Sequence, residues 1–405
     1  MTGSKRGGPL KYLFAVVLIL LAAGTGWIAI RSAATQLMSD GASQAGALAW
    51  KPEALLDGAM REYMTKKGQV RARSLPDIRA AASRLPLDDR PYLLIGSTYL
   101  QRGDIRQATK ALEAGRRLNP RRRPIHLALA DRYLRDGNFV AATDELAVLT
   151  RLVDGTQPQI AGALAQMSVY PETHEAVRRT LRQDIALEQA VLTAMASKDI
   201  PPSDIFAMAS PAAWATANLP GGWGVVLTDR LVNEQRYRLA REIWQRINHL
   251  PNGQVPPLLY NANLDVLPSK PPFNWSVSSN NIAAVDLRSN KLEINYYGRD
   301  TGELVSQFLL LPPGNYRFSH VVSGLQRGLG PTLSWSIACA NRPDSDIAHM
   351  DVPATSATPR RVAVGLTVPD DCPAQRLRLI ARPGEFPMQV SATIDRLQLE
   401  RLNAK

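Results

Sequence analysis

The stretch YLLIGSTYLQRGDIRQATKALEAGRRLNP (Tyr92–Pro120) decides the fold of the first half of the chain, because HLALADRYLRDGNFVAATDELAVLTRL (His126–Leu152) repeats it 34 residues later. In both copies, apolar residues at helical spacing run up to a tyrosine, a Gly-Asp or Gly-Asn turn follows, and a second apolar helix begins. Each copy therefore predicts an antiparallel pair of helices.

Small residues at matching positions of the two copies indicate how each pair packs. Gly96 and Ala130 on the first helix, and Ala108 and Ala142 on the second, let the paired helices approach closely. One pair cannot cover its own apolar face, so this period predicts a stack of such pairs.

With the small residue, Tyr, Gly, Ala and terminal Pro at these offsets, the segment resembles the tetratricopeptide repeat. Tyr92 and His126 stand where that family usually has tryptophan, and the second copy lacks the proline. The resemblance implies an all-α superhelix that binds protein segments in a groove. It implies a groove lined by Leu93, Ser97, Leu100, Gln101, Leu127, Asp131, Leu134 and Arg135, unless the next helix covers the leucines.

The helical region is predicted to span residues 51–250. Lys51 to Arg84 is typical of a helix, a break and a helix, which we interpret as a degenerate first repeat. Gln157 to Ser197 is helical but out of phase, with Pro171 as a start signal. Val225 to Ile247 restores the pattern and predicts one more pair of helices.

The first 50 residues predict a membrane anchor. Residues 1–11 are polar and basic, residues 12–30 carry no charge, and residues 31–50 form a stalk of small residues. At about 1.5 Å per residue the apolar run spans about 28 Å, close to the thickness of a hydrocarbon core. The basic residues before it predict a single pass through a bacterial inner membrane, with a cytoplasmic amino terminus and the bulk of the chain in the periplasm. A cleaved signal peptide is the alternative.

The positive charge is concentrated in the helical half. The chain carries a formal net charge of +12, and residues 61–124 hold 16 Lys and Arg against 6 Asp and Glu. The run Arg121, Arg122 and Arg123 is the candidate contact for an anionic partner. A solvated helical face is the alternative. No nucleic-acid-binding motif accompanies the charge, so we expect no nucleic-acid partner.

The period of the apolar residues changes after a proline-rich segment, residues 251–271, which predicts a linker. Leu292, Ile294 and Tyr296 alternate with polar residues, and the same period of two recurs around Tyr316 and Trp335. About eight short strands without intervening helices predict an antiparallel β-sandwich over residues 272–405.

Two motifs stand at the start of this domain. Tyr260-Asn261-Ala262-Asn263-Leu264 is similar to the Asn-Gly-x-Phe-Glu of carbohydrate-binding modules, and Pro272-Phe273-Asn274-Trp275 to the Pro-Phe-x-Trp that often follows. The domain therefore resembles a galactose-binding-like jelly roll, which implies a sugar-binding class of fold.

The aromatic candidate for stacking on a sugar is Tyr297, which alternates outward with Glu293 and Asn295. An exposed tyrosine without a role is the alternative.

Cys339 and Cys372 are the only two cysteines. A translocated chain with one pair in one domain predicts a disulfide, and two buried free thiols are the alternative.

The chain shows no motif of catalysis. The five histidines are scattered, and no nucleophile elbow, phosphate loop or dinucleotide fingerprint occurs. His126 occupies a packing position of the repeat. Asp344, Asp346 and Asp351 fall in a predicted loop, where calcium is conceivable but a solvated loop is the preferred interpretation. We expect no catalytic residue, no metal and no cofactor.

Together these features predict a multidomain, non-enzymatic scaffold anchored in the inner membrane. Its helical repeats bind protein partners, and its sandwich binds a glycan, during cell-envelope or exopolysaccharide assembly. The alternatives are a carbohydrate-active enzyme with its site in the sandwich, and a purely structural envelope protein.

Overall fold

The computed structural model describes residues 52–402 apart from 67, 252–257, 268–269, 326–331, 354–356 and 386. The predicted tail, membrane helix and stalk, residues 1–50, lie outside the described residues. Among the helices that are described, none has both the length and the apolar character needed to cross a membrane. The chain divides between Ala213 and Trp214 into two compact units.

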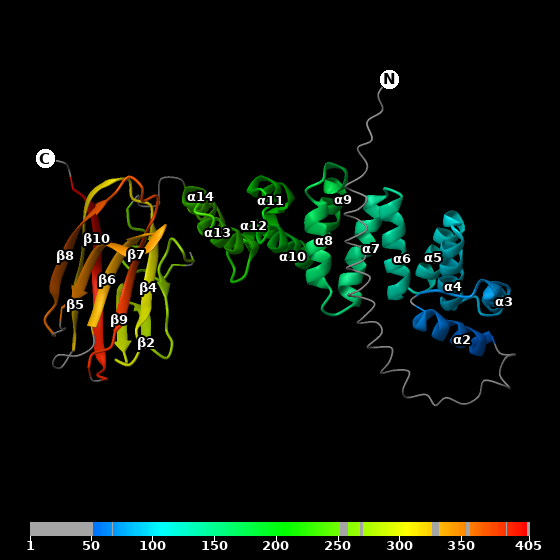
Figure 1. Ribbon diagram of the computed structural model, residues 1–405, viewed down its shortest axis with the longest axis horizontal. Coiled ribbons are helices and arrows are strands. Elements are labelled where there is room, and N and C mark those ends of the chain that lie inside the picture. The colour runs from blue at the N-terminus through cyan, green and yellow to red at the C-terminus, as the bar shows by residue number, and fades with distance from the viewer. Residues whose placement is uncertain are drawn as a thin grey trace, which may run out of the picture. The chain divides into compact units, whose positions relative to one another are not determined.

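The first unit consists of helices that pair along the chain (Figure 1). Pro171 begins a helix, as predicted, and the break between residues 65 and 75 contains a short 3₁₀ turn. The helices are α2 (Pro52–Thr65), α3 (Leu75–Arg84), α4 (Arg90–Arg102), α5 (Ile105–Leu118), α6 (Arg123–Arg135), α7 (Phe139–Leu152), α8 (Gln157–Met167), α9 (Pro171–Leu181), α10 (Ile185–Ala196), α11 (Pro202–Met208) and α12 (Pro211–Ala215).

The two copies of the sequence repeat form equivalent helix pairs, α4 with α5 and α6 with α7. Gly103 and Gly137 occupy the same place in the two turns, both with φ of +74°. Asp104 and Asn138 follow them as amino-terminal caps, each accepting a backbone N–H at 3.3 Å. The predicted helix pairs are therefore confirmed, while the tetratricopeptide assignment stays a prediction.

Small residues hold the paired helices close together. A Cβ atom on Gly96 of α4 would lie 2.7 Å from the side chain of Leu112 on α5. Ala108, Ala130 and Ala142 are fully buried. The predicted close approach of the helices is confirmed at all of these positions.

We expect Gly96→Ala to destabilise the helical unit by about 1–3 kcal/mol, because Leu112 is fully buried and has no room to yield. The control is Gly162→Ala on α8, where the nearest atom to the added Cβ lies 3.8 Å away. That change should stabilise the fold by up to about 1 kcal/mol, since alanine favours helix over glycine. Urea unfolding of both variants measures the difference, and equal effects would contradict the close packing.

The second unit combines two helices with two antiparallel sheets. The predicted last helix pair is confirmed, and ten strands are described where about eight were expected. These elements are α13 (Trp223–Asn233), α14 (Tyr237–Ile247), β1 (Ser276–Val277), β2 (Ala283–Arg288), β3 (Lys291–Tyr296), β4 (Gly302–Leu309), β5 (Gly314–Leu325), β6 (Thr332–Cys339), β7 (Arg342–Val352), β8 (Arg360–Val368), β9 (Gln375–Arg382) and β10 (Val390–Arg401).

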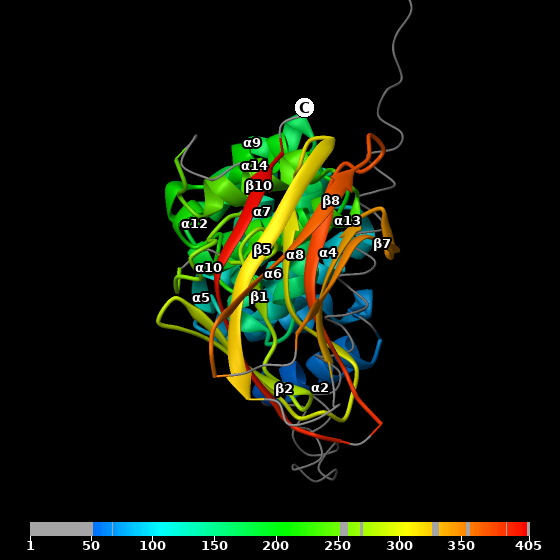
Figure 2. The ribbon, with the colours of Figure 1, turned by 90° about the vertical axis from the view of Figure 1, so that its left-hand side faces the viewer.

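Each sheet holds five strands. The strand order is β1-β4-β9-β6-β7 in the first sheet and β2-β3-β10-β5-β8 in the second, towards which Figure 2 looks. Their inner faces enclose one apolar core, in which Tyr296, Phe318 and Trp335 are buried. The period-two alternation along β3 places Leu292 and Ile294 in the same core.

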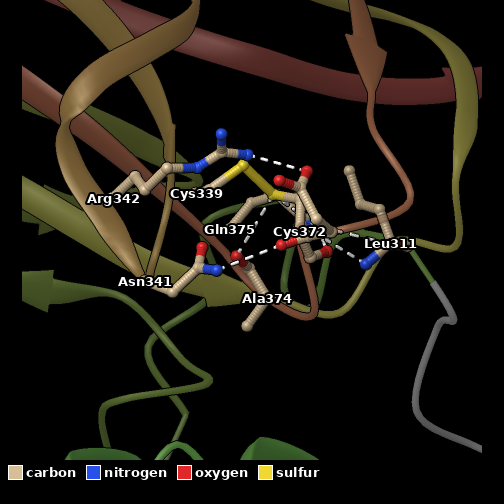
Figure 3. The surroundings of a disulfide bond; sticks show 8 residues. Leu311, Cys339, Asn341, Arg342, Cys372, Ala374 and Gln375 are labelled. Carbon is tan, nitrogen blue, oxygen red and sulfur yellow. Dashed lines mark hydrogen bonds and ion pairs between the residues drawn. A yellow bond between two sulfur atoms is a disulfide. The ribbon is translucent and has the colours of Figure 1, made fainter.

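The predicted disulfide joins Cys339, at the end of β6, to Cys372, just before β9 (Figure 3). Both cysteines are buried, and their Cα atoms lie 5.4 Å apart. Close by, Arg342 donates to the Asp371 carboxylate at 2.7 Å. Closing a loop of 33 residues contributes about 3–4 kcal/mol in the chain-entropy model.

Helix α14 packs on the sandwich rather than standing apart from it. The Trp244 ring contacts Tyr260 and Phe273 at centroid distances of 5.1 and 5.7 Å, and its Nε1 donates to the Lys270 carbonyl at 2.6 Å. The Arg241 guanidinium lies over the same two rings, Trp244 and Phe273, where burial lowers its pKa to about 10. The pair α13–α14, which the sequence placed with the helical repeats, thus belongs to the compact unit of the sandwich.

One polar side chain lies within the apolar core. His320 on β5 is fully buried, with Phe318 and Trp335 at ring distances of 6.1 and 6.0 Å. Neither ring nitrogen has a hydrogen-bond partner among the described residues. Burial lowers the pKa of His320 to about 4, so the ring is neutral in the fold at pH 7.

The stability of the sandwich should therefore fall as the pH falls from about 6.5 to 4. In this window the unfolded chain binds a proton at His320 and the folded chain does not, which removes about 3 kcal/mol by pH 4. The variant His320→Leu should be at least as stable at pH 7, because it buries no unpaired nitrogen. Denaturant unfolding between pH 4 and 7 checks both points. If the two proteins lose stability in parallel over this range, the assignment to His320 is wrong.

Candidate functional site

The outer face of the β4-containing sheet is occupied by its own contacts. Phe308 on β4 stacks with Tyr237 of α14 at 6.2 Å. Further along, Arg376 pairs with Glu303 at 2.8 Å, and Arg378 donates to the Ser336 hydroxyl at 3.0 Å. Phe308, Arg376 and Arg378 are therefore engaged within the fold.

The three aspartates considered for calcium do not lie in a loop. Asp344, Asp346 and Asp351 belong to strand β7, which corrects the sequence prediction. The Asp346 carboxylate accepts from the Ser336 hydroxyl at 2.6 Å, and His349 lies 3.1 Å from Asp351. Among the described residues, no three His, Cys, Asp or Glu side chains are grouped to hold a metal ion.

The outer face of the other sheet carries the predicted glycan candidates. Lys291, Glu293 and Asn295 are exposed on β3, and Tyr297, one residue past the strand, is 39% exposed. The alternation along β3 places all four on one side of the sheet, as the sequence predicts for Glu293, Asn295 and Tyr297. On the neighbouring β10, the Ser391 hydroxyl donates to Asn295 Oδ1 at 2.6 Å. The side chains described on this face are mostly polar.

A pocket of about 350 Å³ opens at the Lys291 end of this line. Three separate segments of the chain form it: a loop before the sandwich, the turn between β2 and β3, and an irregular point in β10. It is lined by Asn263, Ser289, Asn290, Lys291, Asp395 and Arg396. We call this the β3 pocket.

Unusual backbone conformations are concentrated at the β3 pocket. Ser289 and Asn290 both have positive φ, as a two-residue hairpin turn requires. Arg396 has φ of +49°, where the pairing of β10 with β5 shifts register. Asn261 and Leu264, on the adjoining loop, have φ of +53° and +59°. Conformations of this kind cluster at binding sites, since they direct side chains that regular strands cannot place.

Asn261 orders the loop that presents Asn263. Its side chain accepts from the Asp265 N–H and donates to the Asp265 carbonyl, both at 2.9 Å. Its own carbonyl accepts from Trp275 Nε1 at 2.9 Å. Asn290 then donates to the Asp265 carboxylate, which ties this loop to the β2–β3 turn. The quoted sequence motifs therefore have a structural role here, and Asn263 remains exposed at the pocket.

Sequence reasoning missed the β3 pocket, although one signal was present. Ser289 and Asn290 separate two alternating runs, which is typical of a hairpin. Asp395 and Arg396 gave no signal, because a bulge within β10 depends on the pairing of β10 with its neighbours.

The structure places the predicted groove residues partly inside the helical unit. Leu93, Ser97 and Leu134 are buried, which fits the alternative that neighbouring helices cover the leucines. Leu100 and Leu127 are half-buried. The Gln101 amide lies against the Val70 backbone, and Asp131 pairs with Arg135 at 2.9 Å. A role of these residues in binding stays a prediction.

The three arginines between the repeats are not equivalent. Arg122 pairs with Asp89, from the preceding turn, and is thereby engaged within the fold. Arg121 and Arg123 are exposed. Of the three arginines predicted to contact an anionic partner, only Arg121 and Arg123 are therefore exposed.

His126 is buried, as its packing position predicts. Its Nδ1 lies 2.5 Å from the Glu145 carboxylate, which also pairs with Arg116, and its Nε2 lies 2.8 Å from the Pro120 carbonyl. These residues line a pocket of about 330 Å³ whose charged groups are already paired. We interpret it as part of the helix packing.

No protein-family model and no curated protein matches the chain. Among solved structures, the chain is similar to a CBM4 protein, with 16% identity over 36% of this chain and 99% of that one and a TM-score of 0.28. It is also similar to TmCBM61 in complex with β-1,4-galactotriose, with 15% identity, coverage of 32% and 88%, and a TM-score of 0.24. A third is the CBM22-1 xylan-binding domain from Paenibacillus barcinonensis Xyn10C, with 11% identity, coverage of 32% and 87%, and a TM-score of 0.24.

Two asparagines of one loop should respond differently to substitution. We expect Asn261→Ala to cost about 2–4 kcal/mol of stability, because it removes several buried hydrogen bonds and leaves alanine with positive φ. Asn263→Ala, at the exposed tip, should change stability by less than about 0.5 kcal/mol. Thermal unfolding of both variants compares them, and a stable Asn261→Ala would show that the loop does not depend on this side chain.

Proposed function

We propose that the β-sandwich is a non-catalytic glycan-binding module whose site is the β3 pocket together with the line Glu293, Asn295 and Tyr297. The observation that carries the proposal is an exposed polar pocket continued along one strand to an exposed aromatic ring. Sugars present hydroxyl groups to amide and charged side chains, and their apolar faces to aromatic rings.

The dimensions favour an oligosaccharide over a single sugar. Tyr297 lies six positions after Lys291, which corresponds to about 20 Å along a strand. The face between them carries hydroxyl, amide and carboxylate groups from β2, β3 and β10, with Ser391 and Thr393 among them. A chain of sugars lying along β3 would contact both ends of the site.

We propose that the module performs no chemistry. The two carboxylates at the centre of the face, Asp286 and Glu293, stand opposite each other on β2 and β3, and both are exposed. A glycosidase needs two carboxyl groups on either side of the scissile bond, one of them shielded so that it holds a proton. Neither Asp286 nor Glu293 is shielded in this way, which argues against the enzyme alternative at this pair of carboxylates.

We extend the proposal to the whole chain as an envelope scaffold. The stacked helix pairs offer a surface for a protein partner, and the apolar run at residues 12–30 is the proposed anchor in a bacterial inner membrane. The disulfide is consistent with an oxidising compartment such as the periplasm. The module would then hold a polysaccharide near the partner that the helices recruit.

The test is binding of the full chain to an immobilised glycan panel, followed by calorimetric titration of each glycan that binds. We expect Tyr297→Ala and Asn263→Ala each to weaken binding by about tenfold, as the loss of about 1.4 kcal/mol implies. Thr367→Ala is the matched control, since it is exposed on the same face but on β8 at the opposite edge of the sheet.

Two results would reject the proposal. A folded chain that binds no glycan on the panel would favour the purely structural alternative. Release of reducing ends from a bound glycan, abolished by Glu293→Gln, would favour the enzyme.

A further inference from the structure

Two cations lie opposite each other in the hairpin beside the β3 pocket: Lys291 lines the pocket, and Arg288 directly precedes the lining residue Ser289. Arg288 on β2 and Lys291 on β3 are directly paired across the hairpin, and both are exposed. Neither forms an ion pair in the part of the chain that the structure describes. Like charges placed opposite each other on neighbouring strands destabilise the pair, so this arrangement works against the stability of the fold.

A third cation lies on the other side of the pocket. The bulge in β10 places Arg396 there, with its Nε 3.5 Å from Asp395 Oδ1. This Asp395 oxygen is buried and accepts no hydrogen bond from a described residue. The pocket therefore combines two cations, Lys291 and Arg396, with the Asp395 carboxylate, and Arg288 lies next to it in the sequence of the hairpin.

The acidic groups on and near the hairpin form no ion pair with Arg288 or Lys291 in the described part of the chain. Asp286 and Glu293 form the next pair along the hairpin, also with like charges facing each other, and neither is within ion-pair distance of Arg288 or Lys291 in the described residues. Asp265 is engaged by Asn290. A ligand anion between Arg288 and Lys291 would remove their repulsion and gain two charged hydrogen bonds.

We infer that the β3 pocket selects acidic polysaccharides through the carboxylate of a uronic acid, an inference that rests on the proposed glycan-binding function. Arg288 and Lys291 bind the carboxylate, and the Asn263 amide contacts a neighbouring hydroxyl. The flat carboxylate suits the fork of the Arg288 guanidinium. The rest of the glycan continues along β3 towards Tyr297.

The test compares one polymer with its carboxylates free and with the same carboxylates blocked as methyl esters. The full chain is titrated with polygalacturonate and with the same polymer fully methyl-esterified, with alginate and glucuronoxylan as further acidic glycans. We expect at least tenfold tighter binding of the unesterified polymer at 50 mM salt, and a loss of this preference as the salt rises to 500 mM. The double variant Arg288→Gln/Lys291→Gln should lose the preference and bind both forms equally.

Two controls separate the site from general charge and from misfolding. Arg317→Gln removes one positive charge from the same face, on β5, and should leave the preference unchanged. The double variant should have an unfolding temperature equal to or above that of the wild type, since it removes a repulsive pair.

The possible outcomes are distinct. Equal binding of the esterified and free polymers overturns the inference and leaves the proposed function intact. A preference that persists in the double variant places the selectivity elsewhere and overturns this site. Binding of neutral glycans only overturns the inference, and binding of no glycan at all overturns the proposed function with it.

Discussion

The alternation of side chains along β3 is the constraint from which the properties of the sandwich follow. Leu292, Ile294 and Tyr296 must point inward, because the two sheets enclose a single apolar core. The residues between them are then forced outward, whatever they are. The polar line from Lys291 to Tyr297 is a consequence of this geometry, and its chemistry was free to vary without disturbing the core.

The two outer faces of the sandwich differ for an equally simple reason. The outer face of the β4-containing sheet is partly covered by α14, whose aromatic side chains pack against Phe308 and Phe273. The ring contacts of α14 do not involve the outer face of the β3-containing sheet, and the side chains described on that face are mostly polar. A recognition surface is therefore expected on the second face, since a ligand there displaces water and not protein.

Much of the fold was predictable from periodicity, and the errors have identifiable physical causes. Turns such as those at Gly103 and Gly137 are local, so their chemistry appears in the sequence. Strand β7 was missed because Pro343, Asp344 and Asp346 are typical of loops, whereas its pairing with β6 overrides that preference. The pocket was missed because three distant segments form it. Which basic residues are engaged within the fold could not be predicted either, since Arg122, Arg116 and Arg182 pair with Asp89, Glu145 and Glu188, which lie far from them or across a turn in the sequence.

The packing of Trp244 against the sandwich determines where a fragment that contains the sandwich should start. A fragment that starts at Pro272, where the strands begin to be predictable, lacks the indole that covers Phe273 and the tyrosine ring, Tyr237, that covers Phe308. In that fragment Phe273 and Phe308 would form an exposed hydrophobic patch, and we expect the fragment to self-associate. A fragment that starts near Trp214 retains α13 and α14, so Phe273 and Phe308 stay covered by Trp244 and Tyr237.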